Sequence, residues 1–146
     1  MEVVLRAKQI ADKLWQGALA HVSQDGYPEG VEVVLLMAER VEALPNAANV
    51  PVLYLPIPDN PDGLTEEQFA QVYGLCRAVQ GACVLTICHM GENRSGLASA
   101  LLLCLRGMEP AAAVKLVQTN GPHNSSNAPH SFWNPGFNKQ VLEFFS

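Results

Sequence analysis

The sequence predicts an α/β fold in which strands pair in parallel across helical connections. Residues 31–37, 50–57 and 83–87 are runs of β-branched and aliphatic side chains, a pattern typical of buried strands. A helical pattern beginning at Thr65 separates the last two runs, and strand, helix and strand in this order imply a parallel crossover. The chain has 146 residues, of which 49% are hydrophobic, so we expect residues 1–146 to form a single domain with a buried core.

The segments around the first strands are less regular. Residues 3–12 mix apolar and charged side chains, and they fit a short helix or an extended arm equally well. Residues 14–19 are predicted to form a strand, which a loop follows because residues 23–28 are polar and rich in turn formers. Residues 39–48 are expected to form a helical turn or a loop.

A clear helix begins at Thr65. Thr65 and Gln68 form a capping-box pair, and apolar residues recur at helical spacing until Gly81 ends the helix. A Leu-rich helix is predicted over residues 94–106, directly after the 83–87 strand. We expect its apolar side to be buried against the sheet.

The C-terminal part is predicted to contain two more helices. Pro110 fits the first turn of a helix that runs to residue 118. Residues 121–135 are rich in Asn, Ser, Pro and His and therefore predict a loop, and an amphipathic helix over 137–145 closes the chain. The side chains expected to anchor that helix are Val141, Leu142 and Phe145.

Composition and charge argue against several classes of function. The formal net charge is -5, so we expect no nucleic-acid partner. The longest apolar run, residues 97–105, is too short to span a bilayer, so we expect no membrane partner. Four unevenly spaced cysteines, with no signal-peptide pattern before them, predict reduced thiols in a cytoplasmic protein.

The candidate functional site is the stretch from Cys88 to Ser95. The predicted strand leads into Cys88, a short loop containing Gly91 follows, and Arg94 and Ser95 open the next helix. A loop that enters a helix N-terminus directs several backbone N–H groups at one point, where the helix dipole favours an anion. Such a loop would place the Cys88 sulfur at its floor and the Arg94 guanidinium at its rim. This arrangement suits a phosphate bound above a thiolate.

The spacing from Cys88 to Arg94, with Ser95 next, resembles the Cys-x5-Arg-Ser/Thr signature of the protein tyrosine phosphatase superfamily, in its compact dual-specificity branch. Residues 134–137 and 140–142 are similar to the closing helix of these phosphatases. The resemblance implies a central, mostly parallel sheet of four to five strands flanked by helices, with a phosphatase-type phosphate-binding loop. It also implies a cysteine-dependent phosphomonoesterase with a phosphocysteine intermediate.

The resemblance assigns roles to the residues of this loop. Cys88 is expected to attack phosphorus while Arg94 and the backbone N–H groups hold the phosphate oxygens, and Ser95 is expected to help the sulfur leave. The residues expected to bind phosphate are His89, Met90, Gly91, Glu92, Asn93 and Arg94. His89 is expected to face solvent rather than act as a base. Neither a metal nor an organic cofactor is expected.

A phosphatase of this kind needs a proton donor for the leaving oxygen. A carboxyl group on a loop after a neighbouring strand can reach that point. By the resemblance, Asp59 is expected to be this general acid, and Asp62 is the second candidate. Both aspartates also fit an ordinary turn, because Asp, Asn, Pro and Gly are common turn residues.

Other interpretations stay open. The family usually has His immediately before the cysteine and this chain has Ile87, so a catalytically weak or inactive phosphate-binding module (a pseudophosphatase) is the main alternative. A sulfurtransferase also uses a cysteine in an N–H cradle, but its loop lacks this Arg-Ser-Gly entry. A metal site is not expected, because the cysteines form no Cys-x-x-Cys pair.

The loop also bears on the substrate. It contains no Lys or Arg besides Arg94, and Glu92 is expected to place a negative charge near the mouth of the cradle. Additional phosphates would be repelled there, so we expect monophosphate esters, first of all phosphotyrosine, with phosphoserine and phosphothreonine as further candidates. The expected partner is a phosphorylated protein or a small phosphomonoester, and the protein is expected to be a monomer.

Overall fold

The computed structural model describes residues 7–39 and 50–145, and its strands form one five-stranded sheet. The strands lie in the order β1-β2-β5-β3-β4, and neighbours are parallel except for the antiparallel pair of β1 and β2. Their bounds are β1 (Lys8–Ala11), β2 (Leu14–Ala18), β3 (Val33–Leu36), β4 (Val52–Tyr54) and β5 (Val84–Cys88). The predicted α/β class with a mostly parallel sheet is confirmed.

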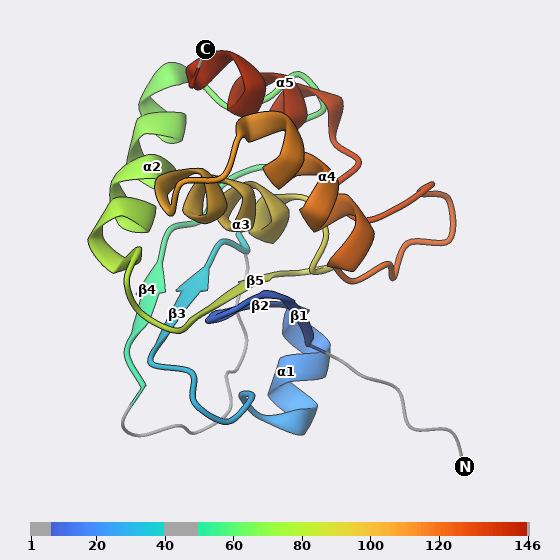
Figure 1. Cartoon of the computed structure of the whole chain (residues 1–146). Coiled ribbons are helices and arrows are strands. Elements are labelled where there is room, and N and C mark those ends of the chain that lie inside the picture. The colour runs from blue at the N-terminus through green and yellow to red at the C-terminus, as the bar shows by residue number, and fades with distance from the viewer. Residues whose placement is uncertain (1–6, 40–49, 146) are drawn as a thin grey trace.

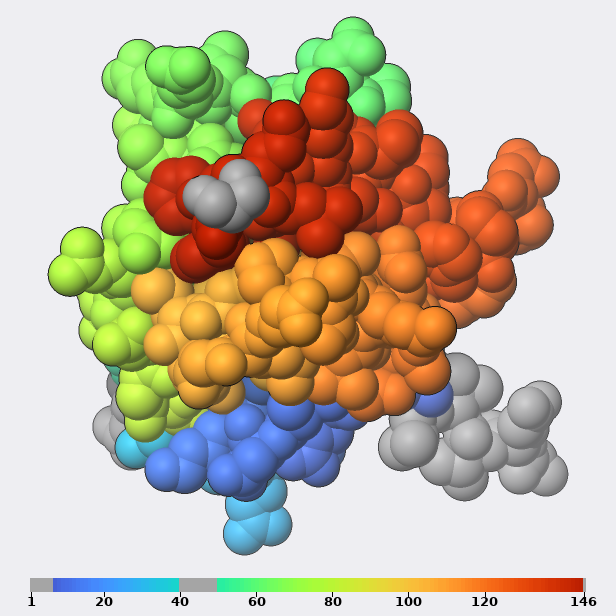
Figure 2. All heavy atoms as spheres, turned by 45° about the horizontal axis from the view of Figure 1, so that its top comes forward, coloured from blue at the N-terminus to red at the C-terminus, as the bar shows by residue number. Residues whose placement is uncertain are grey.

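Five helices lie on the two faces of this sheet (Figure 1). One face carries α1 (Leu19–Asp25), and the opposite face carries the other four. These are α2 (Glu66–Val79), α3 (Arg94–Leu105), α4 (Pro110–Asn120) and α5 (Pro135–Phe144). Figure 2 looks onto the second face, where α5 lies beside α4 and α2. Within the described ranges, no helix has the length and apolar character needed to cross a membrane.

The central strand β5 alternates between two apolar cores. Val84 and Cys88 belong to the larger core under α2–α5, whereas Leu85 and Ile87 belong to the smaller core beside α1. Every residue of β5 is buried, as expected for a parallel strand covered by helices on both faces. The carboxyl end of this strand therefore brings Cys88 to the edge of the sheet where α3 begins.

The helix boundaries follow the predicted capping signals. The Thr65 hydroxyl accepts from Gln68 N at 3.1 Å, and the Gln68 side chain accepts from Thr65 N at 3.1 Å, which confirms the capping box. Proline occupies the first turn of both α4 and α5. Asn134 caps α5 by accepting from Phe137 N at 3.0 Å. The loop predicted from residue 121 lies between α4 and α5, and α5 begins two residues before its predicted start.

Near the N-terminus the structure corrects the prediction for the segment after residues 14–19 and shows which of the two alternatives residues 8–11 adopt. The loop expected after the 14–19 strand begins with a short helix, α1, whose anchors Leu19 and Val22 are buried one turn apart. Two apolar residues among polar neighbours gave too weak a pattern to predict this helix. Residues 8–11 are extended rather than helical. Residues 40–49, which include most of the predicted 39–48 connection, lie outside the described residues.

Two predictions of burial were wrong. The 50–57 run was expected to form a buried strand, but β4 has only three residues at the sheet edge, and Tyr54 is 48% exposed. Prolines at positions 51 and 56 flank it, and proline cannot donate to a strand ladder. In α5, Val141 is fully buried and Phe145 is half-buried, but Leu142 faces solvent with 42% exposure.

Candidate active site

Cys88 is the last residue of β5, and its sulfur lies beside the first turn of α3. The Cys88 Sγ and Ser95 Oγ atoms are 3.2 Å apart, and either can donate a hydrogen bond to the other. Both residues are buried. Because residues 89–93 connect the strand end directly to the helix N-terminus, the unpaired N–H groups of the first turn of α3 lie next to this sulfur.

The carbonyl groups of this loop are bound by neighbouring side chains. Gln16 of β2 donates through Nε2 to Gly91 O at 2.8 Å and to Glu92 O at 3.4 Å. Asn124 donates through Nδ2 to Met90 O at 2.7 Å. In a trans peptide the C=O and the following N–H point in opposite directions, so fixing three successive carbonyls fixes the opposing N–H groups. Successive N–H groups held in one orientation form an anion-binding concavity, and we call residues 88–95 the cradle.

The cradle can pack against β2 only because residue 91 is glycine. Gly91 has a φ of +74°, a conformation that glycine adopts without steric cost. A Cβ at this position would lie 2.6 Å from Ala18 N and 2.7 Å from Gly17 C. Any larger residue would push the loop away from β2.

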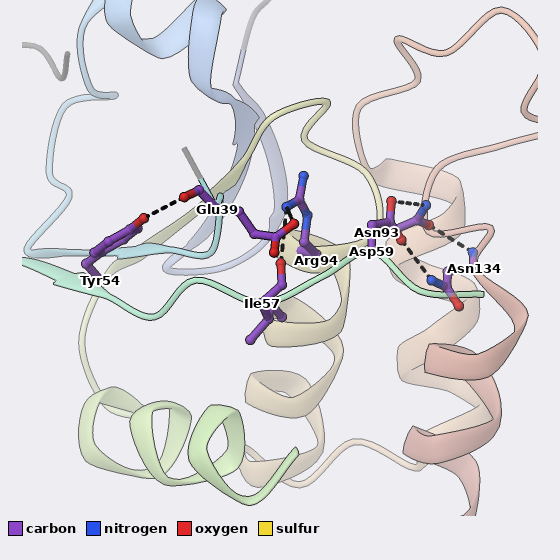
Figure 3. A network of polar contacts seen from close by, with 7 residues as sticks. All are labelled: Glu39, Tyr54, Ile57, Asp59, Asn93, Arg94 and Asn134. Atoms are coloured by element: carbon purple, nitrogen blue, oxygen red, sulfur yellow. Dashed lines mark hydrogen bonds and ion pairs between the residues drawn. The ribbon is translucent and has the colours of Figure 1, made fainter. Parts of the chain in front are cut away.

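Arg94 is the first residue of α3, and its side chain is largely buried. Its Nη1 donates to Ile57 O at 3.2 Å and lies 3.9 Å from Glu39 Oε1 (Figure 3). The Arg94 Nε is buried and has no hydrogen-bond partner among the described residues. A buried donor left without an acceptor costs roughly 1–3 kcal/mol. An oxygen of a bound anion would remove that cost.

Asp59, on the loop after β4, is held between two asparagines (Figure 3). Asn93 donates through Nδ2 to Asp59 Oδ2 at 3.1 Å, and Asn134 donates through Nδ2 to Asp59 Oδ1 at 2.8 Å. The triangle closes because Asn93 Oδ1 accepts from Asn134 N at 2.8 Å. Asp59 is therefore fixed beside the cradle through a cradle residue. Asp62 is exposed, and its N–H donates to Asn60 Oδ1 in an ordinary turn.

Helix α5 anchors the loop that carries Asp59. Gly136 N donates to Pro61 O at 3.0 Å. The Gln140 side chain binds both backbone groups of Leu64, donating to its O at 2.7 Å and accepting from its N at 3.0 Å. The loop over residues 59–64 is thus attached to α5 at several points, although the two segments are far apart in the sequence.

Solved structures provide close matches to this arrangement. Human DUSP28 superposes with a TM-score of 0.75 at 23% identity, over 97% of this chain and 94% of its own. A mouse putative dual specificity phosphatase, solved with zinc tungstate, gives a TM-score of 0.76 at 19% identity, over 99% and 89%. The human tyrosine phosphatase-like serine/threonine/tyrosine-interacting protein gives 0.68 at 21% identity, over 96% and 95%. The chain has the dual-specificity phosphatase fold.

The likeness to these phosphatases is one of fold. The sequence matches no family model and no curated protein. Within the phosphatase fold, Cys88 ends β5, and Arg94 and Ser95 open α3, so the three residues flank the connecting loop as the sequence pattern predicts. In the described part of the chain, no group of His, Cys, Asp and Glu side chains is arranged to hold a metal ion.

The expected position of the Glu92 charge was wrong. Glu92 is 1% exposed, and its carboxylate binds the loop between α4 and α5 instead of standing at the mouth of the cradle. Oε2 accepts from Asn124 N at 2.5 Å and from Ser125 N at 2.8 Å, and Oε1 accepts from Ser125 Oγ at 2.6 Å and from Trp133 Nε1 at 3.2 Å. In this phosphatase fold the carboxylate is a structural anchor, because four donors compensate its burial.

The surroundings of Ile87 explain why this position holds an apolar residue instead of the family's usual His. The side chain points to the face opposite Cys88 and is completely buried in the core beside α1, with Leu36 and Leu85. This core contains no polar partner for an imidazole among its buried members. The cradle is instead supported by Gln16, whose amide reaches the loop from the adjacent strand.

The supporting contacts of three residues were not predicted from the sequence. Gln16 is a fully buried polar side chain within an apolar strand, a signal that could have identified it. Asn134 precedes a proline at the start of a helix, which indicates a cap but not its bond to Asp59. Glu92 depends on a loop more than thirty residues away, and no local pattern reveals such a contact. His89 and Met90 are exposed, and the solvent-facing position expected for His89 is confirmed.

Proposed function

We propose that the protein is a cysteine-dependent phosphomonoesterase of the protein tyrosine and dual-specificity type. The observation that carries the proposal is the cradle itself. A cysteine sulfur lies 3.2 Å from the Ser95 hydroxyl at a helix N-terminus, and the adjoining Arg94 has a buried Nε with no acceptor within the described residues. This set of groups suits a tetrahedral, dianionic ester with its phosphorus above sulfur.

In the first step, the Cys88 thiolate attacks phosphorus in line with the leaving oxygen. The S–P bond forms as the P–O bond to the alcohol breaks, and Asp59 gives its proton to the departing oxygen. Arg94 and the N–H groups from His89 to Arg94 hold the three equatorial oxygens while charge redistributes.

In the second step, water attacks phosphorus and Asp59 takes its proton. The S–P bond breaks, and inorganic phosphate and the Cys88 thiolate are released. Ser95 assists, because its hydroxyl at 3.2 Å can donate to the departing sulfur. Neither step calls for a metal ion or an organic cofactor.

The substrate class follows from the charge around the cradle. The loop offers Arg94 as its one cationic side chain, and the chain has a net charge of -5. We infer a monophosphate ester, first of all phosphotyrosine in a protein, with phosphoserine, phosphothreonine and small phosphomonoesters as further substrates. All four cysteines are free thiols, which suits a monomeric enzyme in the reducing cytoplasm.

A second candidate is a phosphate-binding module with little or no turnover. The observation that favours it is the state of Asp59, both of whose oxygens accept amide hydrogen bonds, so that a proton on this group would compete with them. The absence of the usual His before the cysteine favours the same interpretation. This candidate binds phosphate or vanadate in the cradle and releases no product.

The two candidates are separated by phosphate release from p-nitrophenyl phosphate and from a phosphotyrosine peptide. The phosphatase proposal expects turnover by the native protein, its loss in Cys88→Ser with substrate binding retained, and loss of both binding and turnover in Arg94→Ala. Vanadate binding without turnover by the native protein would establish the binding module. Turnover that Cys88→Ser retains would contradict the proposed nucleophile.

A further inference from the structure

A hollow of about 710 Å³ opens next to the cradle. One wall is the exposed side chain of Met90, a residue of the cradle itself, and the other is the loop between α4 and α5. That loop projects from the body in Figure 1 and protrudes at the right edge in Figure 2. Its wall includes Trp133, Pro129 and Ala128, beside the uncharged polar residues 124–127.

The two walls are held in place before any ligand arrives. Glu92 binds both ends of the loop segment, at Asn124 and Ser125 on one side and at Trp133 on the other. Asn124 also donates to Met90 O at 2.7 Å. The cradle loop and the projecting loop are therefore one hydrogen-bonded unit, so the hollow is preformed, and Met90 is the cradle residue that borders it. A preformed pocket lowers the entropy cost of binding.

The chemistry of the hollow is that of an uncharged, apolar subsite. None of its lining residues is charged, and the Glu92 carboxylate behind it is buried with four donors. Met90 and Trp133 are 45% and 37% exposed, and a thioether and an indole ring suit an aliphatic or aromatic group. An acidic group would meet no cation here and would approach the negative charge of Glu92.

We propose that this hollow is a specificity subsite that receives a large apolar side chain flanking the phosphorylated residue of a peptide substrate. The inference rests on the proposed function, because it takes the cradle as the phosphate site. Met90 is two residues from Cys88, so their Cα atoms are at most roughly 7 Å apart, and the hollow that Met90 borders lies beside the phosphate site. An extended peptide advances about 3.3 Å per residue, which places a side chain one or two positions from the phosphoresidue at the hollow.

The test measures binding, so it does not require turnover. Matched phosphotyrosine peptides carry Leu, Phe, Ala, Asp or Arg at the flanking positions, one position at a time, and their Kd for the Cys88→Ser protein is measured by fluorescence anisotropy. Leu or Phe at one or two of these positions should bind roughly three- to tenfold more tightly than Ala, because apolar area is buried. Asp should bind more weakly than Ala.

Variants on the same background locate the preference. Trp133→Ala should reduce the ratio of Kd values for the Ala and Leu peptides toward one. Ala128→Asp leaves the Trp133 ring and the Met90 thioether in place but puts a carboxylate in the hollow. This variant should bind the Ala peptide more tightly than the Leu peptide. Leu142→Ala is the matched control, because Leu142 is a similarly exposed apolar residue on α5 outside the hollow, and its ratio should equal that of the parent.

Each outcome decides the proposal. Equal affinities across the peptide series, or a preference for Asp or Arg, would overturn the subsite while leaving the phosphate site intact. A preference for Leu that Trp133→Ala and Ala128→Asp both retain would place the recognition elsewhere and also overturn it. If no phosphopeptide binds and vanadate does not bind either, the proposed function itself fails, and the subsite falls with it.

Discussion

Among single residues, three uncharged amide side chains hold the cradle and Asp59 in place. Gln16 fixes two carbonyls of the cradle, and Asn93 and Asn134 hold the two oxygens of Asp59. An amide can orient a carboxylate or a carbonyl without adding charge beside a dianionic substrate. The field at the cradle is therefore left to Arg94 and the helix N-terminus.

The role of Asp59 predicts a leaving-group dependence. Asp59→Asn keeps the shape of the side chain but removes the proton, so kcat for an alkyl phosphate should fall by about 10²–10⁴-fold. The loss should be much smaller for p-nitrophenyl phosphate, whose leaving group needs less protonation. Steady-state kinetics on both substrates measures this. Asp62→Asn is the control and should behave as the native protein; the reverse pattern would mean that the acid is Asp62.

The position of Ile87 predicts that the family's usual residue is costly here. Ile87→His buries an imidazole in an apolar core that offers no polar partner among its buried members, at a cost of about 1–3 kcal/mol in the free energy of unfolding. Ile87→Val should cost about 0.5–1.5 kcal/mol from lost packing alone. Urea denaturation of the three proteins compares them. A histidine variant as stable as the native protein would show that the core can satisfy the ring.

The raised pKa values of the other three cysteines predict that thiol labelling concentrates on the site. Burial raises the pKa of Cys104 to about 11 and raises the pKa values of Cys76 and Cys83 as well, so these thiols stay protonated near pH 8. Iodoacetate at that pH should therefore modify Cys88 first, and Cys104 should join only as the pH approaches 11. Mass spectrometry of the labelled peptides reports the order. Labelling of Cys104 at pH 8 ahead of Cys88 would contradict this account.

At the level of secondary-structure elements, α5 supports the loop that carries Asp59, the proposed general acid. Its first residues approach that loop so closely that only glycine fits at position 136. A Cβ there would press on Gly63 N and lie 2.5 Å from Asp62 C and 2.6 Å from Pro61 O. The contact lies between backbones, so neither side can give way by a side-chain rotation.

This contact reverses the usual effect of a glycine-to-alanine substitution in a helix. Gly74→Ala in α2 meets no atom within 4 Å and should raise the free energy of unfolding by about 0.5–1 kcal/mol. Gly136→Ala should instead lower it by about 1–3 kcal/mol and reduce turnover, because the loop that carries Asp59 must move. Thermal unfolding of both variants tests the contrast. A stabilised Gly136→Ala protein with full activity would show that α5 does not position the loop.

The elements that were predicted correctly are those with several local signals in agreement. α2 has a capping box, helical spacing and a stop, and β5 is a continuous apolar run leading to a glycine-containing loop. α1 was not predicted because only two of its side chains, Leu19 and Val22, are buried. β4 was expected to be buried because its residues are apolar, but its exposure depends on its position at the edge of the sheet.

The candidate site was predictable to the same extent. Cys88, Arg94 and Ser95 lie within eight consecutive residues, so their spacing alone brought them together. The supports of the site come from β2 and from the α4–α5 connection, and tertiary packing decides those contacts. That is why the Glu92 charge was placed at the mouth of the cradle when its carboxylate binds a distant loop.

At the level of the whole molecule, Arg106 joins three segments at the end of the sheet opposite the cradle. Its guanidinium donates to four carbonyls, at 2.7 Å to Gln80, 3.1 Å to Asp12, 3.3 Å to Lys13 and 2.8 Å to Ala82. The turn between β1 and β2, the end of α2 and the end of α3 thus meet at one side chain. Planar donors in a fixed fork suit this task better than a single ammonium does.

Replacing this side chain should destabilise the fold and leave the chemistry unchanged. Arg106→Lys keeps the charge but not the fork, and the free energy of unfolding should fall by about 1–3 kcal/mol. Arg77→Lys on the exposed surface of α2 is the control and should change it by less than about 0.5 kcal/mol. Guanidinium chloride denaturation checks both, with kcat measured alongside. Equal stabilities for the two variants would show that the four bonds contribute little.

If the phosphoryl group passes through the sulfur of Cys88, rapid-quench mass spectrometry should capture it there. The Asp59→Asn protein, in which breakdown of the intermediate should be slow, is mixed with excess p-nitrophenyl phosphate, quenched in acid and digested. We expect one phosphoryl group on the peptide that contains Cys88, appearing no more slowly than product and absent from Cys88→Ser. Product formation with no phosphate on that peptide, or with phosphate on a histidine, would contradict it.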